Sequence, residues 1–138
     1  MRVLFLCVHN SARSQLAEGL LRAMAGDRVQ VFSAGSEPSR VHPLAIQVLQ
    51  ERGIDASQHR SKSVNEFLNE KFDYVITLCA EEVCPVFLGA MTRLHWALPD
   101  PSAAQPNPEE QLAAFRRTAD ELDDRLQKFI SEKQVGQI

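Results

Sequence analysis

The chain has 138 residues, of which 44% are hydrophobic and 24% charged, a composition typical of one globular domain. Its formal net charge of −3 disfavours a nucleic-acid-binding protein, because such proteins usually carry a basic surface. No stretch approaches the roughly 18 apolar residues of a membrane-spanning helix, and the N-terminal apolar run is too short for a signal peptide. We therefore expect a cytoplasmic protein that contacts no membrane and in which residues 1–138 form a single domain.

Strands and helices alternate in the first half of the chain. Arg2–Cys7 is a nearly continuous apolar run, typical of a buried parallel strand. Apolar residues at helical spacing predict a helix over Arg13–Ala25, which ends before Gly26. The pattern then predicts a second strand over residues 29–33, followed by a helix over residues 43–52 with proline in its first turn.

The second half of the chain continues this alternation. We expect a short helix over residues 63–68, a third strand over 72–78 and a fourth over 93–98. Residues 99–108 contain four of the seven prolines, which predicts a loop. From Glu109 onward the apolar residues recur at alternating steps of three and four, which predicts one long amphipathic helix.

This alternation predicts an α/β fold with a parallel sheet of about four strands flanked by helices. Cys7, Ser33, Cys79 and Asp100 all stand at or just beyond the carboxyl end of a predicted strand. Because ligands of such sheets bind outside the carboxyl ends of the strands, we expect these residues to meet at one edge.

The stretch CVHNSARS, residues 7–14, joins the first strand directly to the first helix. A short connection of this kind leaves backbone N–H groups unpaired, and they can curl inward to form a cradle for an anion at a helix N-terminus. Arg13 adds a forked guanidinium that can bind two oxygens of a tetrahedral oxyanion. The same positive field favours the thiolate form of Cys7, which is the nucleophilic form.

Two polar residues of this stretch complete the predicted site. Ser14 can donate a hydrogen bond to the Cys7 thiolate, and Asn10 can adopt a left-handed conformation that ties the loop to neighbouring backbone. The predicted oxyanion-binding residues are Val8, His9, Asn10, Ser11, Ala12, Arg13 and Ser14.

The other two cysteines, Cys79 and Cys84, leave several interpretations open. They can be a redox-active dithiol that supplies two electrons, or inert thiols buried in the core. A metal site that combines them with His95 and His9 is a weaker alternative, because the close paired spacings typical of zinc ligands are missing. We therefore expect no metal and no cofactor.

The sequence CVHNSARSQLAE resembles the phosphate-binding loop of the low-molecular-weight protein tyrosine phosphatase superfamily. Its Asn-Ser-x-Arg-Ser pattern and the Ala-Glu continuation are most similar to the thioredoxin-coupled arsenate reductases built on that fold. The resemblance continues through the rest of the chain at Ser33–Gly35 (SAG), Thr77–Cys79 (TLC), Cys84-Pro85, His95-Trp96 and Asp100-Pro101.

This resemblance implies a reaction with three cysteines. Cys7 attacks arsenate while Asp100 protonates the leaving oxygen, and Cys79 then attacks Cys7 and releases arsenite. Cys84 attacks Cys79 in turn, and the resulting Cys79–Cys84 disulfide is reduced by thioredoxin, or by glutaredoxin or a low-molecular-weight thiol in some relatives. Phosphate or sulfate competes with arsenate for the loop. Arg13 completes the implied set of catalytic residues.

Two departures from the family pattern bear on function. Aromatic residues usually stand beside the acid in the phosphatases, whereas here Asp100 is followed by Pro101, Ser102 and Ala103. Lys62 occupies a position that is acidic in relatives that bind potassium, so we expect it to pair with Glu18 and to exclude that cation. A low-molecular-weight phosphatase and a non-catalytic oxyanion-binding regulatory protein remain as alternatives.

Overall fold

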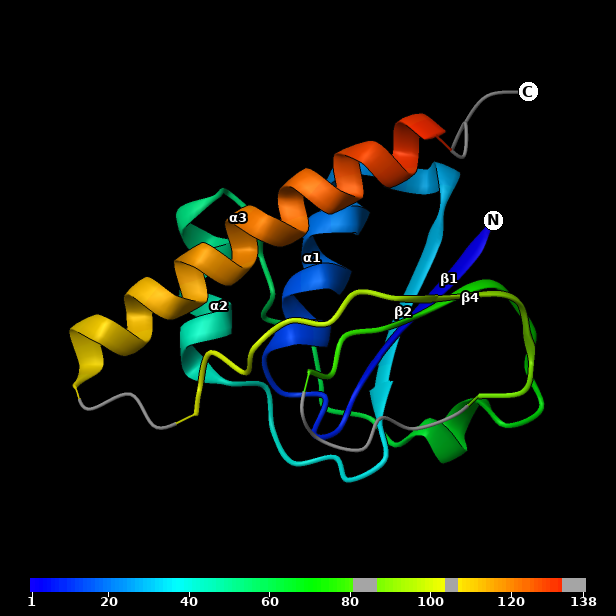
Figure 1. The fold of residues 1–138 in the computed structure, drawn as a ribbon, viewed down its shortest axis with the longest axis horizontal. Helices are drawn as coiled ribbons and strands as arrows, with labels where there is room; N and C mark the ends of the chain where they lie inside the picture. The colour runs from blue at the N-terminus through cyan, green and yellow to red at the C-terminus, as the bar shows by residue number, and fades with distance from the viewer. Residues whose placement is uncertain (81–86, 104–106, 133–138) are drawn as a thin grey trace.

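The computed structural model describes residues 1–80, 87–103 and 107–132. Strands and helices follow one another as the sequence predicts, and the last described element is one long helix that crosses the molecule (Figure 1). The elements are β1 (Arg2–Cys7), α1 (Arg13–Ala25), η1 (Gly26–Arg28), β2 (Gln30–Gly35), α2 (Pro43–Glu51), η2 (Val64–Phe67), β3 (Phe72–Thr77), β4 (Ala90–His95) and α3 (Pro108–Glu132).

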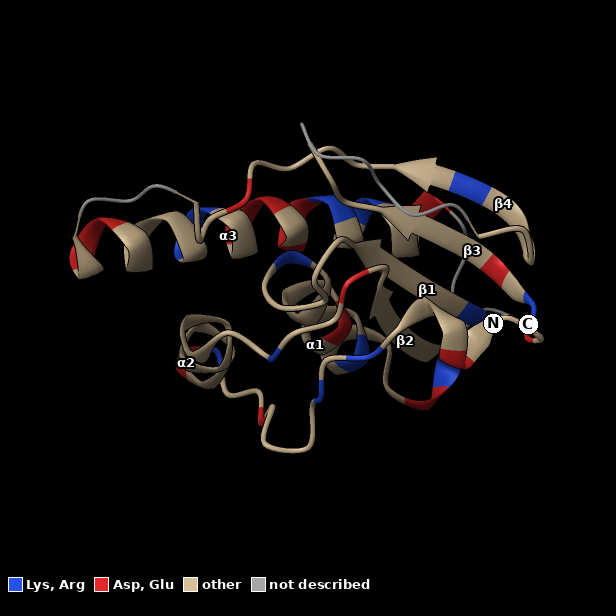
Figure 2. Ribbon diagram, turned by 90° about the horizontal axis from the view of Figure 1, so that it is seen from below, with Lys and Arg blue, Asp and Glu red and all other residues tan. Residues whose placement is uncertain are grey.

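The four strands form one parallel sheet in the order β2-β1-β3-β4, which confirms the predicted α/β class (Figure 2). In this register Cys7 lies beside Gly35 on β2, and Thr77 on β3 lies between Leu6 and His95 of its two neighbours. All four strands therefore end at the same edge of the sheet. Cys7 is the last residue of β1, and Cys79 and Asp100 follow β3 and β4 as predicted, whereas Ser33 lies inside β2 opposite Phe5, because β2 continues to Gly35.

Successive side chains of β1 point to opposite faces of the sheet and pack into two separate hydrophobic cores. Val3 and Phe5 point to the face covered by α1, α2 and α3, where they join the larger core. Leu4 and Leu6 point to the opposite face, where they pack with Phe67 and other aromatic side chains in a smaller core. Burial on both faces explains why β1 is an uninterrupted apolar run.

The fourth strand differs from its prediction. It spans Ala90–His95 rather than residues 93–98, because β4 is an edge strand whose residues 91–93 are exposed and carry no apolar alternation. The buried apolar residue Leu98 misled the prediction: it follows the strand and is held by a backbone hydrogen bond to Leu78. The other predicted boundaries agree with the structure to within two residues.

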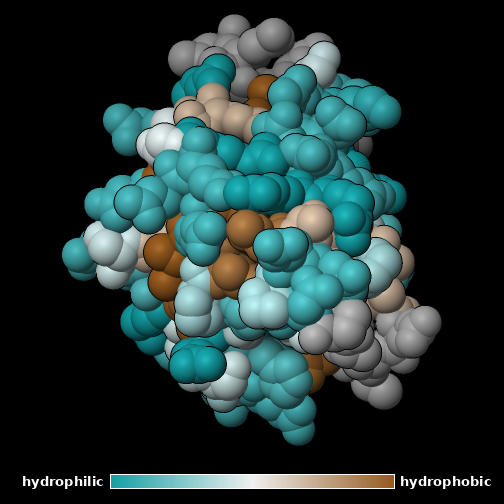
Figure 3. Space-filling view, turned by 90° about the vertical axis from the view of Figure 1, so that its left-hand side faces the viewer, coloured by the Kyte–Doolittle hydropathy of each residue, from teal (hydrophilic) through white to brown (hydrophobic). Residues whose placement is uncertain are grey.

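The surface at the end that carries α2 is mostly hydrophilic, with hydrophobic side chains gathered in its middle (Figure 3). No helix in the described ranges combines the length and apolar character needed to cross a membrane.

Candidate active site

The connection between β1 and α1 is a tight loop whose shape depends on Asn10. This residue has a φ of 47°, in the left-handed region, as the sequence predicts. Three hydrogen bonds hold its buried side chain and carbonyl in place: Lys62 N donates to Asn10 Oδ1 at 2.8 Å, and Gln15 Nε2 donates to the Oδ1 and O atoms at 3.0 and 3.1 Å. These bonds stabilise a backbone conformation that a non-glycine residue seldom adopts.

The carbonyl groups of the loop face away from the site. Glu37 N donates to Val8 O at 2.9 Å, Ser39 N to His9 O at 3.2 Å, and His42 N to Ser11 O at 2.9 Å. Because the C=O of one residue and the N–H of the next point in opposite directions across a trans peptide, the following N–H groups point the other way. The segment after β2 thus leaves the loop N–H groups available to an anion.

Cys7 lies at the base of this loop with its side chain almost fully buried. Its Sγ atom is 2.9 Å from Ser14 Oγ, and Asn10 Nδ2 donates to the same Ser14 oxygen at 2.7 Å. Since Asn10 occupies an acceptor position of Ser14 Oγ, the hydroxyl hydrogen is available for donation to Cys7. Ser14 therefore places a hydroxyl donor directly against the sulfur of the candidate nucleophile.

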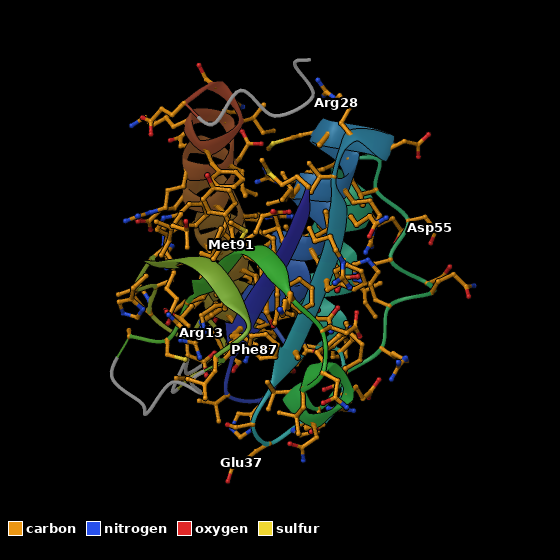
Figure 4. The ribbon with its side chains drawn as sticks, turned by 90° about the vertical axis from the view of Figure 1, so that its right-hand side faces the viewer. Arg13, Arg28, Glu37, Asp55, Phe87 and Met91 are labelled. Atoms are coloured by element: carbon orange, nitrogen blue, oxygen red, sulfur yellow. The ribbon has the colours of Figure 1, made fainter. Side chains whose placement is uncertain are left out.

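Arg13 is buried and its guanidinium is fixed from several sides. Nη1 donates to Leu98 O at 3.0 Å and to Leu78 O at 3.5 Å, and Nη2 lies 4.0 Å from Asp100 Oδ2. The side chain therefore connects the loop to the segments that follow β3 and β4. Figure 4 shows Arg13 and Glu37 toward the carboxyl end of the sheet and Arg28 at the opposite end.

Asp100 presents one carboxylate oxygen to the site. Its Oδ1 accepts hydrogen bonds from Ser102 N at 2.9 Å and Ser102 Oγ at 2.7 Å, which leaves Oδ2 on the side of Arg13. The side chain is 27% exposed, so it can exchange protons with solvent. An acid placed this way can protonate an oxygen that leaves an anion bound by Arg13.

These groups surround a cavity of about 210 Å³ that is lined by Cys7, His9, Ser11, Ala12, Arg13, Ser39, Asp100 and Ser102. The predicted loop residues and the predicted acid therefore meet in one place. A larger cavity, about 410 Å³, lies by the end of α2 among residues such as Ile46 and Ile54 and contains none of the predicted site residues. The smaller cavity is the candidate site because it contains the thiol, the guanidinium and the acid.

Cys79 packs next to this site without lining the cavity. It is buried, and it packs in one cluster with Cys7 and Val8, because Leu78 N bonds to Leu6 O at 2.9 Å and aligns the two strand ends. Cys7 is a free thiol, whereas Cys79 is disulfide-bonded in this structure. Cys84, predicted to act after Cys79, lies outside the described residues.

Lys62 lies beneath the loop and pairs with Glu18, as predicted, with 3.5 Å between Nζ and Oε1. Burial raises the pKa of Glu18, but Lys62, a hydrogen bond from Ser33, and the charges of His59 and Arg22 together outweigh it, so this pKa falls below the usual value. Burial lowers the pKa of Lys62, and Glu18 opposes that change.

Within the described ranges, no three His, Cys, Asp or Glu side chains gather closely enough to hold a metal ion.

Sequence reasoning did not identify four residues that shape this site, Gln15, Gly35, Ser39 and Ser102, as parts of it. A signal for Ser102 was present, because an Asp two residues before a Ser often accepts a hydrogen bond from its backbone N–H. The contacts of Gly35 and Ser39, and the bond of Gln15 to Arg60 O, join segments that are distant in sequence, and no local pattern indicates them.

Comparisons with known proteins agree with this geometry. The family model described as "Low molecular weight phosphotyrosine protein phosphatase" matches residues 2–137. An arsenate reductase of Halalkalibacterium halodurans is 42% identical over 129 residues, covering 92% of this chain and 93% of the relative. An arsenate reductase of Bacillus subtilis is 40% identical with the same coverage of both chains.

Solved structures show the same relationship. The chain is similar to an arsenate reductase in the phosphate-binding state, with a TM-score of 0.79, 34% identity, and coverage of 95% of this chain and 97% of the other. A thioredoxin-dependent arsenate reductase of Corynebacterium glutamicum gives a TM-score of 0.76 and 35% identity, covering 99% of this chain and 63% of that one. With the family model matching almost the whole sequence, the chain belongs to the low-molecular-weight phosphotyrosine protein phosphatase family.

Proposed function

We propose that this chain is an arsenate reductase that works through a cysteine nucleophile and a disulfide relay, and that it serves arsenic detoxification. The observation that carries the proposal is the packing of two buried cysteines, Cys7 and Cys79, in one cluster beside the cavity that Cys7 lines. A hydrolytic phosphatase clears its intermediate with water and needs no second thiol, whereas a reductase needs a second thiol to supply electrons.

The first step forms a bond between sulfur and arsenic. The Cys7 thiolate attacks arsenate held by the loop N–H groups and Arg13, and one arsenate oxygen leaves as water after Asp100 donates a proton. Arsenic remains in the +5 state during this step. The orientation of Asp100 Oδ2 toward Arg13 supports the assignment of Asp100 as the acid.

Reduction occurs in the second step. The Cys79 thiolate attacks the sulfur of Cys7, the S–As bond breaks, and its electron pair goes to arsenic, which leaves as arsenite in the +3 state. The two thiols lose two electrons and form the Cys7–Cys79 disulfide. We infer that Cys84 then attacks Cys79, releases Cys7 as a thiolate, and leaves a Cys79–Cys84 disulfide for an external reductant.

The relatives support thioredoxin as that reductant, since one similar structure is described as thioredoxin-dependent. Glutaredoxin or a low-molecular-weight thiol would balance the reaction equally well. A relay reset by such thiols needs a reducing compartment, so we place this chemistry in the cytoplasm. The described residues that line the cavity include no Phe, Tyr or Trp, which disfavours phosphotyrosine as the substrate.

A coupled assay tests the proposal. The reduced protein is mixed with arsenate, NADPH, thioredoxin and thioredoxin reductase, and NADPH oxidation is followed; a parallel reaction contains glutaredoxin, glutathione and glutathione reductase. We expect arsenate-dependent oxidation in one of the two systems, inhibited by phosphate. If neither system oxidises NADPH in the presence of arsenate while the protein hydrolyses an aryl phosphate, the chain is a phosphatase and the proposal is wrong.

A further inference from the structure

Residues 60–62 run beneath the loop of residues 8–12, the oxyanion loop, and each of the three makes a hydrogen bond to this loop or to Gln15, which holds it. Lys62 N donates to Asn10 Oδ1 at 2.8 Å, and Ser61 Oγ donates to His9 O at 2.9 Å. Arg60 O accepts a hydrogen bond of 2.9 Å from the Gln15 side chain, which itself holds Asn10. This strip of backbone is thus a support for the conformation of the loop.

The side chain of Lys62 fixes this strip from the inside. Its ammonium donates to Arg60 O at 2.7 Å, within the same strip, and reaches Ser33 Oγ at 3.3 Å and Glu18 Oε1 at 3.5 Å. Lys62 and its two partners outside the strip are all buried, so these bonds are little weakened by water. A lysine is seldom buried to this degree unless it is paired.

A continuous series of hydrogen bonds leads from this ammonium to the nucleophile. The strip held by Lys62 positions the Asn10 side chain, Asn10 Nδ2 donates to Ser14 Oγ at 2.7 Å, and Ser14 Oγ lies 2.9 Å from Cys7 Sγ. If the strip shifts, Asn10 loses the bond that orients its amide, and Ser14 no longer presents its hydrogen to the sulfur.

We propose that Lys62 is a positioning residue for the nucleophile: its buried ammonium holds residues 60–62 in register with the loop, and so keeps Asn10 and Ser14 aligned on Cys7. This inference rests on the assignment of Cys7 as the nucleophile in the proposed function. Lys62 touches neither the substrate cavity nor Cys7 and acts only through the loop.

The charges around Glu18 provide a matched control. Arg22 also pairs with this carboxylate, with 2.9 Å between Nη1 and Glu18 Oε2, but its other bonds go to Val31 O and His59 Nε2, and none goes directly to residues 60–62 or to the loop. His59 Nε2 lies 3.7 Å from the same oxygen. Loss of Arg22 thus removes a cation from Glu18 without removing any direct bond between residues 60–62 and the loop, so it separates a charge effect from a positioning effect.

The test measures the reactivity of Cys7 directly, without arsenate. Wild type, Lys62→Met and Arg22→Met are reduced, treated with iodoacetamide across a range of pH, and the alkylated peptide that contains Cys7 is quantified by mass spectrometry. We expect Lys62→Met to react about tenfold more slowly near pH 7, as the loss of one buried charge-assisted hydrogen bond predicts, and Arg22→Met to react like wild type.

Chemical rescue gives a second readout in a single protein. In Lys62→Ala, propylammonium can occupy the space left by the side chain and should restore the alkylation rate, whereas tetramethylammonium at equal ionic strength, which has no N–H donor, should not. If Lys62→Met does not fold, Lys62→Leu takes its place, because it also lacks a donor for Arg60 O.

Two results would overturn this inference. One is a Lys62 variant whose Cys7 reacts as fast as in wild type; the other is an equal loss in the Lys62 and Arg22 variants, which would mean that only the charge around Glu18 matters. A wild-type Cys7 that reacts no faster than free cysteine would instead contradict the assignment of the nucleophile, so the two failures are distinguishable.

Discussion

A Cβ atom at Gly35 would lie 2.4 Å from the carbonyl oxygen of Val8. It would also lie 2.8 Å from Asn10 N and 2.9 Å from Cys7 O, so the end of β2 touches the oxyanion loop backbone to backbone. Gly35 does not have a positive φ, and its role is to leave space rather than to allow an unusual conformation. The loop can reach its position only because this side chain is absent.

Gly35→Ala should therefore displace the loop. Backbone atoms cannot move aside as a flexible side chain can, so we expect a loss of about 1–3 kcal/mol of stability and most of the arsenate reduction. Chemical denaturation and the coupled assay measure the two effects. Gly19→Ala is the control, because its Cβ meets only side-chain atoms, of Leu49 and His59, and activity should stay near that of wild type. Full activity in Gly35→Ala would contradict the close contact.

Arg13→Lys should reduce kcat/KM for arsenate by roughly a hundredfold, which is typical for the loss of an oriented donor to a developing charge. A lysine ammonium cannot make the two-pronged contact with an oxyanion, nor the bonds of Arg13 to Leu78 O and Leu98 O. Arg28→Lys, at the opposite end of the molecule (Figure 4), is the matched control and should behave as wild type. Equal kinetics of the Arg13 and Arg28 variants would remove Arg13 from the site.

Cys79→Ser separates reduction from hydrolysis. Without a second thiol the S–As bond cannot be broken by electron transfer, so catalytic arsenate turnover should disappear. Any slow hydrolysis of an aryl phosphate should persist, because Cys7 and its loop are unchanged, whereas Cys7→Ser should abolish both activities. Parallel measurements of NADPH oxidation and p-nitrophenol release make the comparison. Wild-type turnover of arsenate in Cys79→Ser would show that the relay does not use this residue.

Ser102→Ala should lower kcat with little change in KM. The hydroxyl donates to Asp100 Oδ1 at 2.7 Å, and without it the carboxyl group turns more freely while the arsenate ligands stay in place. We expect a loss of roughly threefold to tenfold, since the backbone N–H of residue 102 still holds the same oxygen. Ser102→Thr keeps the hydroxyl and should recover most of the rate. A change confined to KM would mean that Ser102 binds substrate rather than orients the acid.

The stability of the fold should decrease as the pH falls from about 7.5 to 5.5. Burial is the main cause that lowers the pKa of His42 and of His59 below the ordinary value of 6.5, so both stay neutral in the fold at pH values where the unfolded chain binds protons. His42 also accepts a hydrogen bond from Leu44 N at the start of α2. His42→Asn preserves such a cap and removes the titration, so the urea midpoint should vary less with pH than in wild type. An identical pH dependence in both proteins would contradict this assignment.

The sequence pattern predicted most helices and strands correctly, because the apolar spacing that marks a helix or a strand lies within a few neighbouring residues. The apolar run of β1 and the spacing along α3 gave their boundaries closely, and the short polar connection after Cys7 indicated an anion site. The edge strand β4 was displaced by three residues because exposure removes the apolar signal that marks a buried strand. The role of Gly35 was not predicted, because it arises where two segments of the fold come into contact.

The guanidinium of Arg13 is held by main-chain carbonyl groups of Leu78 and Leu98. An arginine side chain that is mobile in solvent loses conformational entropy when it binds a ligand, and this loss weakens binding. Here the loss is incurred during folding, when the chain closes around the side chain. The affinity for an oxyanion is therefore linked to the integrity of the segments that follow β3 and β4, so a substitution there can weaken binding without touching the anion.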